Sequence, residues 1–248
     1  MNNPQPVAAL VVAAGSGVRM GSDIPKALRR LAGEPLLVHA IRRLARGGVT
    51  SMVVVVRPED EAEIGEALTA IDDAVELRVV PGGAERQDSV RLGLQAVADL
   101  VPSPSVLLVH DAARPLVDPD TVARVVAAVH DGDAAVVPVV DVVDSIRQRD
   151  SSGGSVGLDR SRLLAVQTPQ GFDTDTLVRA HAHVAEHGVA VTDDAGACEA
   201  AGVQVATVEG STTGLKITHP YDLVLAEAML ADDEQNVDTE PDGSRMPA

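Results

Sequence analysis

Short apolar runs alternate with longer amphipathic segments over residues 7–140 of the chain. Runs rich in valine, leucine and alanine predict buried strands at 7–14, 51–57, 75–80, 105–111 and 134–140. Segments with helical periodicity predict helices at 34–48, 58–71, 84–100 and 118–132. Because the strands are apolar on both faces, we expect an α/β protein in three layers, with helices on both sides of a mostly parallel sheet.

Residues 141–170 interrupt this alternation. They contain two polar, strand-like arms around the turn SSGGSVG, which predicts an inserted hairpin, or β-arm. A two-stranded ribbon is only marginally stable alone in water. We therefore expect the arm to pack on another surface, for which a second subunit is the natural candidate. A flexible flap is the alternative.

The alternation resumes after the arm. It predicts helices at 173–188, 192–202 and 219–231, and strands at 203–210 and 214–218. From residue 231 to the end there are six acidic residues and one arginine, with two prolines and few apolar residues. We therefore expect a single domain over 1–230, followed by a disordered acidic tail over 231–248.

Composition and charge narrow the classes of function. A formal net charge of −17 opposes binding to nucleic-acid backbones or anionic membranes. One Phe, one Tyr and no Trp leave few platforms on which single-stranded nucleic acid could stack. The only cysteine, Cys198, can form no intramolecular disulfide, which favours a reducing compartment and a cytoplasmic protein. The first apolar run has no basic residue before it and ends at Gly15, so we expect neither a signal peptide nor a membrane span.

The loop after the first strand, AAGSGVRMGSDIPKAL, combines glycines with cations. Gly15 and Gly17 would let backbone N–H groups approach phosphate oxygens, and Arg19 and Lys26 would complete such a site. A dinucleotide fingerprint would need a third glycine where this chain has Met20, and the P-loop pattern is absent. The loop therefore favours a polyphosphate carrying several charges, and a tight turn with surface cations is the alternative.

Other candidate positions follow later strands. Asp111 would lie at the carboxyl end of a strand, where open α/β sheets bind ligands and where a carboxylate can hold Mg²⁺ beside phosphates. Arg114 could face the same crevice, or form a salt bridge with Asp111. Lys216 lies in an apolar segment, so it must find an anion or reach solvent. Gly83 and Ser89 could read a ligand through backbone and hydroxyl groups, or could simply cap a helix.

The histidines and the cysteine are weaker candidates for chemistry. His183 and His187 are four residues apart, but a zinc site would need further ligands, so a solvated helix face is favoured. His110 precedes Asp111, yet no serine-hydrolase pattern accompanies it. Cys198 is expected to be a small buried side chain.

Six motifs, in this order, resemble those of the 2-C-methyl-D-erythritol 4-phosphate cytidylyltransferase family. They are AAGSGVRMGSDIPKAL, GGAERQDSV, VHDAARP, LDRSRLLAVQTPQGF, TDDAG and LKITHPYDL. The resemblance implies a Rossmann-like nucleotidyltransferase fold whose β-arm clasps a second subunit to form a homodimer. It also implies the reaction: CTP and methylerythritol phosphate give the CDP-linked alcohol and pyrophosphate, with Mg²⁺ or another divalent cation.

The resemblance also implies a role for each matching residue. Catalytic positions are Arg19, Lys26 and Lys216. Nucleotide-binding positions are Ala13, Ala14, Gly15, Gly17, Gly83, Ser89, Asp111 and Ala112. Substrate-binding positions are Asp111, Arg114, Ser145, Arg160 and Lys216, with Asp111 also a metal ligand. Ser145 and Arg160 would reach the substrate of the neighbouring subunit, so the active site would be shared.

Some positions depart from the family pattern, and other functions remain open. Ala84 stands where some members carry Asp, Ser145 where Thr is common, and Arg147 where Lys is common. A cytidylyltransferase acting on ribitol 5-phosphate or a similar polyol phosphate is the first alternative, although the triplet Ala-Ala-Gly at 13–15 favours methylerythritol phosphate. A non-catalytic nucleotide-binding subunit is disfavoured by the retained cations, and a dinucleotide oxidoreductase comes last.

Overall fold

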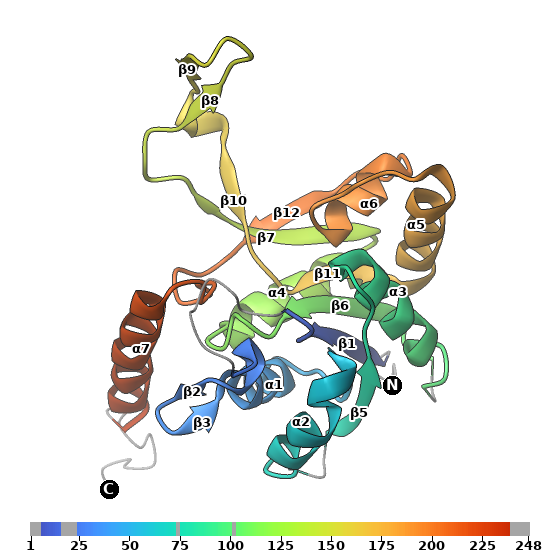
Figure 1. Ribbon diagram of the computed structural model, residues 1–248, viewed down its shortest axis with the longest axis vertical. Coiled ribbons are helices and arrows are strands. Elements are labelled where there is room, and N and C mark those ends of the chain that lie inside the picture. Colours follow the sequence, from blue (N-terminus) through green and yellow to red (C-terminus); the bar gives the residue numbers. More distant parts are fainter. Residues whose placement is uncertain (1–5, 16–23, 73–74, 101–102, 239–248) are drawn as a thin grey trace, which may run out of the picture.

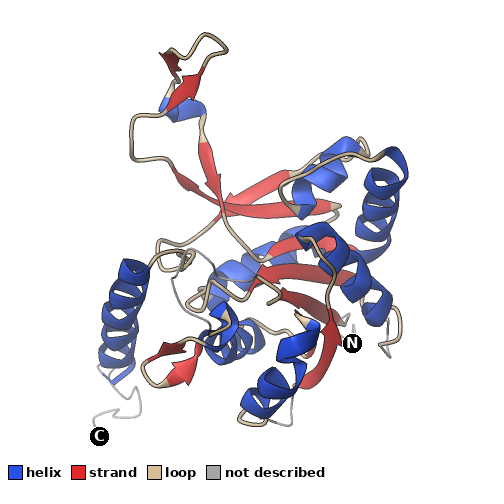
Figure 2. Ribbon diagram, viewed as in Figure 1, coloured by secondary structure: helices blue, strands red, loops and turns tan. Residues whose placement is uncertain are grey.

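The fold is built around one mixed sheet with helices on both sides (Figures 1 and 2). The structure is a computed structural model that describes residues 6–15, 24–72, 75–100 and 103–238, with side chains to residue 233. The strands of the sheet are β1 (Val7–Val12), β4 (Ser51–Val56), β5 (Glu76–Pro81), β6 (Val106–Asp111), β7 (Ala135–Asp141), β10 (Leu164–Val166), β11 (Gln170–Asp173) and β12 (Ala206–Glu209). Their order is β10-β7-β11-β6-β1-β4-β5, and β12 pairs with β7.

Most pairings in the sheet are parallel, as predicted. Strand β1 pairs in parallel with β4 and β6, β4 with β5, and β12 with β7. Strand β11 runs antiparallel between β6 and β7, and β10 runs antiparallel to β7. The sequence did not predict β11, because its four residues contain one large apolar side chain, Phe172, and no alternation to recognise.

Alternate residues of β1 face opposite sides of the sheet, as a strand requires. Val7, Ala9 and Val11 join a core with α1 (Leu36–Arg46), α2 (Glu61–Leu68) and α4 (Pro119–His130). Ala8 and Leu10 join a second core with α3 (Arg86–Val97), α5 (Thr174–His187) and α6 (Asp194–Ala200). Both faces of the sheet are therefore covered, which confirms the three-layer prediction.

Within the described residues, no helix is long and apolar enough to span a membrane.

Several short elements lie outside this frame. Single 3-10 turns occur at η2 (Lys26–Leu28), η3 (Pro58–Asp60) and η4 (Arg160–Arg162). Strands β2 (Arg30–Leu31) and β3 (Glu34–Pro35) form a small hairpin. The predicted strand at 214–218 is wrong, because this segment is a loop. One backbone hydrogen bond, from Ile217 N–H to the Ala113 carbonyl (2.8 Å), ties the loop to the segment after β6.

The last helix, α7 (Pro220–Asp238), extends beyond the predicted boundary. The prediction of disorder from residue 231 is therefore wrong for 231–238, and residues 239–248 lie outside the described part of the chain. Alanine, glutamate and glutamine at 231–235 favour continuation of a helix. An ion pair between Arg43 on α1 and Asp233 (2.5 Å) also ties this extension to the domain.

A hairpin projects away from the sheet over the segment that was predicted to form the β-arm (Figure 1). The chain leaves along β7, forms the antiparallel pair β8 (Arg147–Arg149) and β9 (Ser155–Gly157), and returns through β10. At the tip, the Asp150 carboxylate accepts hydrogen bonds from the N–H groups of Ser152 and Gly154, both at 2.9 Å. Gly153 between them has a φ of +86°, which glycine adopts without strain.

Candidate active site

A cavity of about 620 Å³ opens beside the carboxyl ends of β1, β4, β5 and β6. The described residues that were predicted to bind nucleotide all line it, together with two predicted cations. These are Ala13, Ala14, Gly15, Lys26, Gly83, Ser89, Asp111, Ala112 and Lys216. The parallel register explains the convergence, because Val12 of β1 pairs with Asp111 of β6 and the two following loops leave the sheet together. Arg19 and Gly17 lie outside the described residues.

Asp111 and Lys216 form an ion pair in this cavity. The Lys216 Nζ donates to Asp111 Oδ2 at 2.7 Å, and Arg86 Nη2 lies 3.8 Å from Asp111 Oδ1. Burial would raise the pKa of Asp111, but the charges of Lys216 and Arg86 outweigh it and hold that pKa below its ordinary value. The Lys216 side chain is 45% exposed, so this lysine finds an anion and also reaches solvent, as its apolar surroundings required.

The loop of Lys216 is held by a small core of its own. The next residue, Ile217, is fully buried in a cluster with Leu31, Leu36, Leu116 and Ala226. This cluster joins the β2–β3 hairpin to α7. The backbone of Lys216 is thus fixed by its neighbour, whereas its half-exposed side chain is not enclosed.

Gly83 and Ser89 support one another where β5 meets α3. The Gly83 N–H donates to the Ser89 hydroxyl at 3.2 Å. A Cβ on Gly83 would lie 2.3 Å from Asp88 Cβ, so only glycine allows this approach. Simple capping by Ser89 does not describe the geometry, because the N-cap of α3 is Glu85 and its side chain makes no capping bond. Ser89 instead fixes the loop that precedes the helix.

A buried histidine orders the backbone around Asp111. His110 is fully buried, and burial lowers its pKa to about 4, so it is neutral at pH 7. Its Nε2 lies 3.1 Å from the Arg114 carbonyl and its Nδ1 lies 3.1 Å from the Thr168 hydroxyl. A carbonyl only accepts, so Nε2 carries the proton and Thr168 donates to Nδ1. The same hydroxyl accepts from the Asp111 N–H at 3.1 Å.

Arg114 lies beside the cavity and does not line it. Its guanidinium donates to the carbonyls of Gly214 (2.7 Å) and Val166 (3.3 Å), and burial lowers its pKa below the ordinary value. Among the described residues, Asp111 forms ion pairs with Lys216 and Arg86, so the alternative of an Asp111–Arg114 salt bridge is wrong. Arg114 instead links the loop before Lys216 to the base of the arm.

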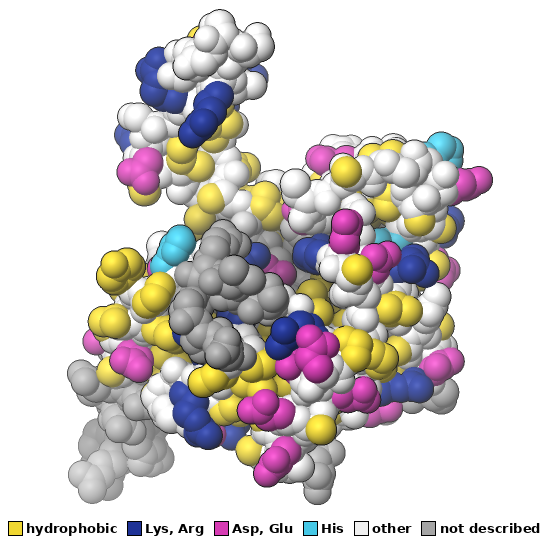
Figure 3. Space-filling model, viewed as in Figure 1, with side chains coloured by type: hydrophobic (Ala, Val, Ile, Leu, Met, Phe, Trp, Pro, Cys, Tyr) yellow, Lys and Arg dark blue, Asp and Glu magenta, His cyan; other side chains and the backbone are white. Residues whose placement is uncertain are grey.

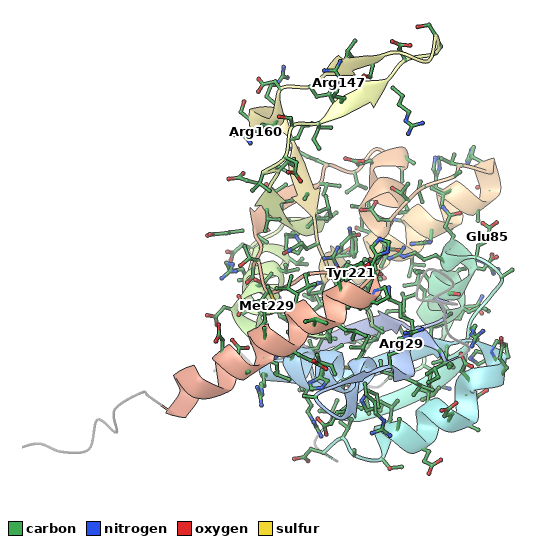
Figure 4. The ribbon with its side chains drawn as sticks, turned by 60° about the vertical axis from the view of Figure 1, so that its left-hand side comes forward. Arg29, Glu85, Arg147, Arg160, Tyr221 and Met229 are labelled. Atoms are coloured by element: carbon green, nitrogen blue, oxygen red, sulfur yellow. The ribbon has the colours of Figure 1, made fainter. Side chains whose placement is uncertain are left out.

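Two predicted residues are separated from the cavity of their own chain. Ser145 and Arg160 are exposed on the arm, and the Arg160 guanidinium donates to the Val143 carbonyl. Figure 4 shows Arg160 and Arg147 on the arm, above the body of the protein. Neither Ser145 nor Arg160 lines the cavity.

A second set of charged residues at the cavity was not predicted from the sequence. Arg86 lines the cavity and pairs with Asp194, which is fully buried and also contacts His181. Arg86 lies within the motif GGAERQDSV and Asp194 within TDDAG, both of which contribute to the family resemblance. The available signal was a second acid directly after an N-cap Asp, because such an acid can turn inward.

The donor set of the cavity suits a metal ion that arrives with phosphates. In the described ranges, no group of three or more His, Cys, Asp or Glu residues could hold a metal on its own. Mg²⁺ commonly binds through one or two carboxylates plus substrate phosphates. Asp111 is mostly buried in the cavity, next to the loop that begins at Ala13, and could supply one such carboxylate. The described residues around it do not provide enough ligands to hold the ion without phosphates.

Comparisons with known proteins agree on one family. A family model described as 2-C-methyl-D-erythritol 4-phosphate cytidylyltransferase matches residues 7–232. Curated proteins of that name from Streptomyces avermitilis and Saccharopolyspora erythraea are 49% and 51% identical. The alignments cover 90% and 91% of this chain, and 91% and 99% of those proteins.

Solved structures show the same likeness. The crystal structure of 2-C-methyl-D-erythritol 4-phosphate cytidylyltransferase from Thermus thermophilus superposes with a TM-score of 0.74 at 35% identity. It covers 91% of this chain and 99% of that chain. The 4-diphosphocytidyl-2C-methyl-D-erythritol synthase from Anaerococcus prevotii gives a TM-score of 0.78 at 25% identity, over 92% and 96% of the two chains.

Proposed function

The chain belongs to the 2-C-methyl-D-erythritol 4-phosphate cytidylyltransferase family, and we propose that its 620 Å³ cavity is where it transfers CMP from CTP to methylerythritol phosphate. The chain is thus a nucleotidyltransferase of isoprenoid biosynthesis, which releases pyrophosphate. The observation that carries the site is the convergence of Lys26, Asp111 and Lys216 on one cavity with the backbone at 13–15 and Gly83.

The nucleoside is read mainly by backbone groups in this proposal. Ala13, Ala14 and Gly15 follow β1, and Gly83 faces them from the end of β5. The Ser89 hydroxyl fixes Gly83, so the cytosine and ribose meet a preformed surface. Ala84 has no polar side chain to add a contact, which leaves the recognition to the backbone and to Ser89.

The transfer itself needs positive charge and alignment. A phosphate oxygen of methylerythritol phosphate attacks the α-phosphorus of CTP, and pyrophosphate leaves on the opposite side. Negative charge spreads over the equatorial and leaving oxygens, where Lys26 and Arg19 stabilise it and Lys216 holds the substrate phosphate. No general base is required, because the attacking phosphate is already ionised. His110 is buried and bonded at both ring nitrogens, so it serves the backbone and not proton transfer.

A divalent cation is part of the proposal. Enzymes of this family are generally divalent-cation dependent, and we propose Mg²⁺, or another divalent cation, held by Asp111 and the nucleotide phosphates. When bound, such an ion supplies charge that phosphate oxygens require during transfer. Asp111 is kept ionised for this role by the cations beside it.

We propose that the enzyme is a homodimer formed through the β-arm. Apolar side chains on the arm are exposed in the single chain, with Val143 at 78%, Val156 at 54% and Leu164 at 49%. Tyr221 and Val224 also expose apolar surface on α7. Figure 3 shows hydrophobic side chains gathered on the left of the molecule, over the upper part of that helix. Surfaces of this kind support association. In a two-fold dimer, Ser145 and Arg160 of each arm would reach the substrate phosphate of the partner.

We propose the cytoplasm as the compartment, where a single buried cysteine suits reducing conditions.

The choice of acceptor is tested by comparing two polyol phosphates. The enzyme receives CTP and Mg²⁺ with either methylerythritol phosphate or ribitol 5-phosphate, and pyrophosphate release is followed. We expect a kcat/KM at least about tenfold higher with methylerythritol phosphate, a difference of about 1.4 kcal/mol in transition-state stabilisation. Equal or faster release with ribitol 5-phosphate would establish the alternative acceptor. No release with either would favour a non-catalytic nucleotide-binding protein.

A further inference from the structure

An alternating row of charges runs from the cavity into the interior of the protein. Lys216 and Arg86 lie on either side of the Asp111 carboxylate, at 2.7 Å and 3.8 Å. Behind Arg86, Asp194 accepts a hydrogen bond from its Nη2 at 2.6 Å. At the inner end, His181 Nε2 lies 3.0 Å from the other oxygen of Asp194. The row joins the loop before α7, β6, α3, α6 and α5.

The inner part of this row is fixed. Asp194 is fully buried and His181 is 3% exposed. The first turn of α6 is tied to β11, because Gln170 donates to the Asp193 carboxylate (2.8 Å) and accepts from the Ala195 N–H (3.1 Å). A buried carboxylate must keep its partner, so Asp194 holds the Arg86 guanidinium in place.

The outer part is different. Lys216 is a flexible ammonium on a half-exposed side chain, and its proposed role is to bind the phosphate of the acceptor. When it turns to that phosphate, the Asp111 carboxylate loses the Lys216 hydrogen bond that orients it. Arg86 is a planar guanidinium whose Nη2 is already hydrogen-bonded to Asp194, so it stays beside Asp111 while Lys216 moves.

We propose that Arg86, held in place by Asp194, is a positioning residue that keeps the Asp111 carboxylate oriented while Lys216 engages the acceptor. This inference rests on the proposed cytidylyl transfer. It assigns Arg86 to the reaction through Asp111 and not to the binding of the nucleotide. Loss of a residue that orients a metal ligand, the role proposed for Asp111, costs about 10- to 100-fold in metal affinity or activity.

The test must separate positioning from simple structural support, because Arg86→Gln alone leaves Asp194 buried without its cation. The double variant Arg86→Gln/Asp194→Asn removes both charges of the pair and keeps side chains of similar size that hydrogen-bond. Arg91→Gln is the matched control, because Arg91 lies on the same helix in an exposed ion pair with Asp88. For each protein, we would measure the melting temperature, CTP affinity by calorimetry, and kcat and KM for both substrates.

We expect Arg86→Gln to melt several degrees lower than the wild type, and the double variant to regain most of that loss. In both variants, kcat falls by about 10- to 100-fold, while CTP affinity changes less than about threefold. Arg91→Gln keeps the wild-type values. Wild-type kcat in the folded double variant would overturn the proposal, since support of the fold would then be the whole role of Arg86. So would a large loss of CTP affinity at unchanged kcat, which would make Arg86 a nucleotide ligand.

Arg86→Lys provides a second variant if the double variant does not regain stability. Lysine keeps one charge, but its ammonium sits on a flexible stem and is not held between Asp194 and Asp111 as rigidly as the planar guanidinium of Arg86. We expect a melting temperature near that of the wild type and a kcat between those of wild type and Arg86→Gln. Wild-type kcat in Arg86→Lys would contradict positioning by the anchored guanidinium. A wild-type enzyme without cytidylyl transfer would refute the proposed function instead.

Discussion

Asp111 is constrained from its backbone and from its side chain. Its N–H donates to Thr168, whose hydroxyl is fixed by neutral His110. Its carboxylate lies between Lys216 and Arg86. A residue ordered in this way loses little entropy when a charged ligand arrives, which favours its use at a reacting centre.

Gly83 offers a test of the nucleotide loop at the same scale. A methyl group at this position would meet Asp88 at 2.3 Å and move the loop from α3. We expect Gly83→Ala to raise the KM for CTP by about tenfold, or about 1.4 kcal/mol of lost binding. Gly65→Ala is the control, because Gly65 on α2 faces open space. It should leave the KM unchanged and raise the free energy of unfolding by about 0.5–1 kcal/mol. An unchanged KM in Gly83→Ala would argue against a nucleotide site at this loop.

At the scale of elements, regular strands and helices were predictable and irregular ones were not. Strand β1 can be recognised from its continuous apolar run, and helix α1 from the helical spacing of Leu37, Ile41 and Leu44. Strand β11 does not, because it is held in the sheet by pairing on both sides and not by its own composition. The loop at 214–218 was mistaken for a strand because Ile217 is buried by α7, a contact that depends on tertiary structure.

The same limit applies to the site. The sequence could predict that residues at strand ends, such as Asp111, lie at one cavity, because strand topology determines their positions. Arg86 and Asp194 were not, because they meet only when α3 and α6 pack on the same face of the sheet. The two residues are 108 positions apart in the sequence, so their pairing cannot be predicted from sequence spacing.

The packing of α6 can be followed through the only cysteine in the chain. Cys198 is fully buried, and burial raises the pKa of its thiol from 9.0 to about 12. Thiolate is therefore almost absent from the folded protein at pH 8, and a disulfide reagent should label Cys198 only as fast as the protein unfolds. Because the raised pKa favours the neutral thiol in the folded state, its contribution to stability is complete below pH 9 and is lost as pH rises toward 12. Rapid labelling of native protein at pH 8 would contradict this packing.

The arm makes a prediction about assembly. Leu164 on β10 is 49% exposed in the single chain, and the proposed dimer would cover it. We expect Leu164→Asp to raise the dimer dissociation constant by about a hundredfold, or about 2.8 kcal/mol, because a carboxylate would be buried without a partner. Sedimentation measures the change. Val178→Asp, at a 45% exposed position on α5 away from the arm, should leave the dimer intact (Figure 1). If both variants had the dimer dissociation constant of the wild type, the interface would lie elsewhere.

At the scale of the whole molecule, the sheet gathers the loops that are proposed to bind nucleotide around one cavity, while the arm carries Ser145 and Arg160 away from them. A single chain thus separates residues that the proposed reaction requires together. This separation favours the proposal that each active site takes its arm residues from the other subunit.

Complementation between two inactive variants tests this sharing. Lys26→Ala should slow turnover by about a hundredfold or more, the scale for loss of a transition-state donor, and Arg160→Ala should also be impaired. In a heterodimer of the two, one site keeps both Lys26 and the Arg160 of the other chain. Mixing and subunit exchange should therefore restore up to about a quarter of wild-type activity, since half the dimers are mixed and each has one intact site of two. Absence of recovery in verified heterodimers would count against a shared site.

The most direct test of the central claim follows the phosphorus atom. CTP labelled at the α-phosphorus is incubated with the enzyme, Mg²⁺ and methylerythritol phosphate, with Lys26→Ala in parallel. We predict that the label moves into 4-diphosphocytidyl-2-C-methyl-D-erythritol, with one unlabelled pyrophosphate for each label transferred, and that Lys26→Ala slows both at least about a hundredfold. Label that stays in CTP, or appears as free CMP at the same rate without the acceptor, would contradict cytidylyl transfer in this cavity.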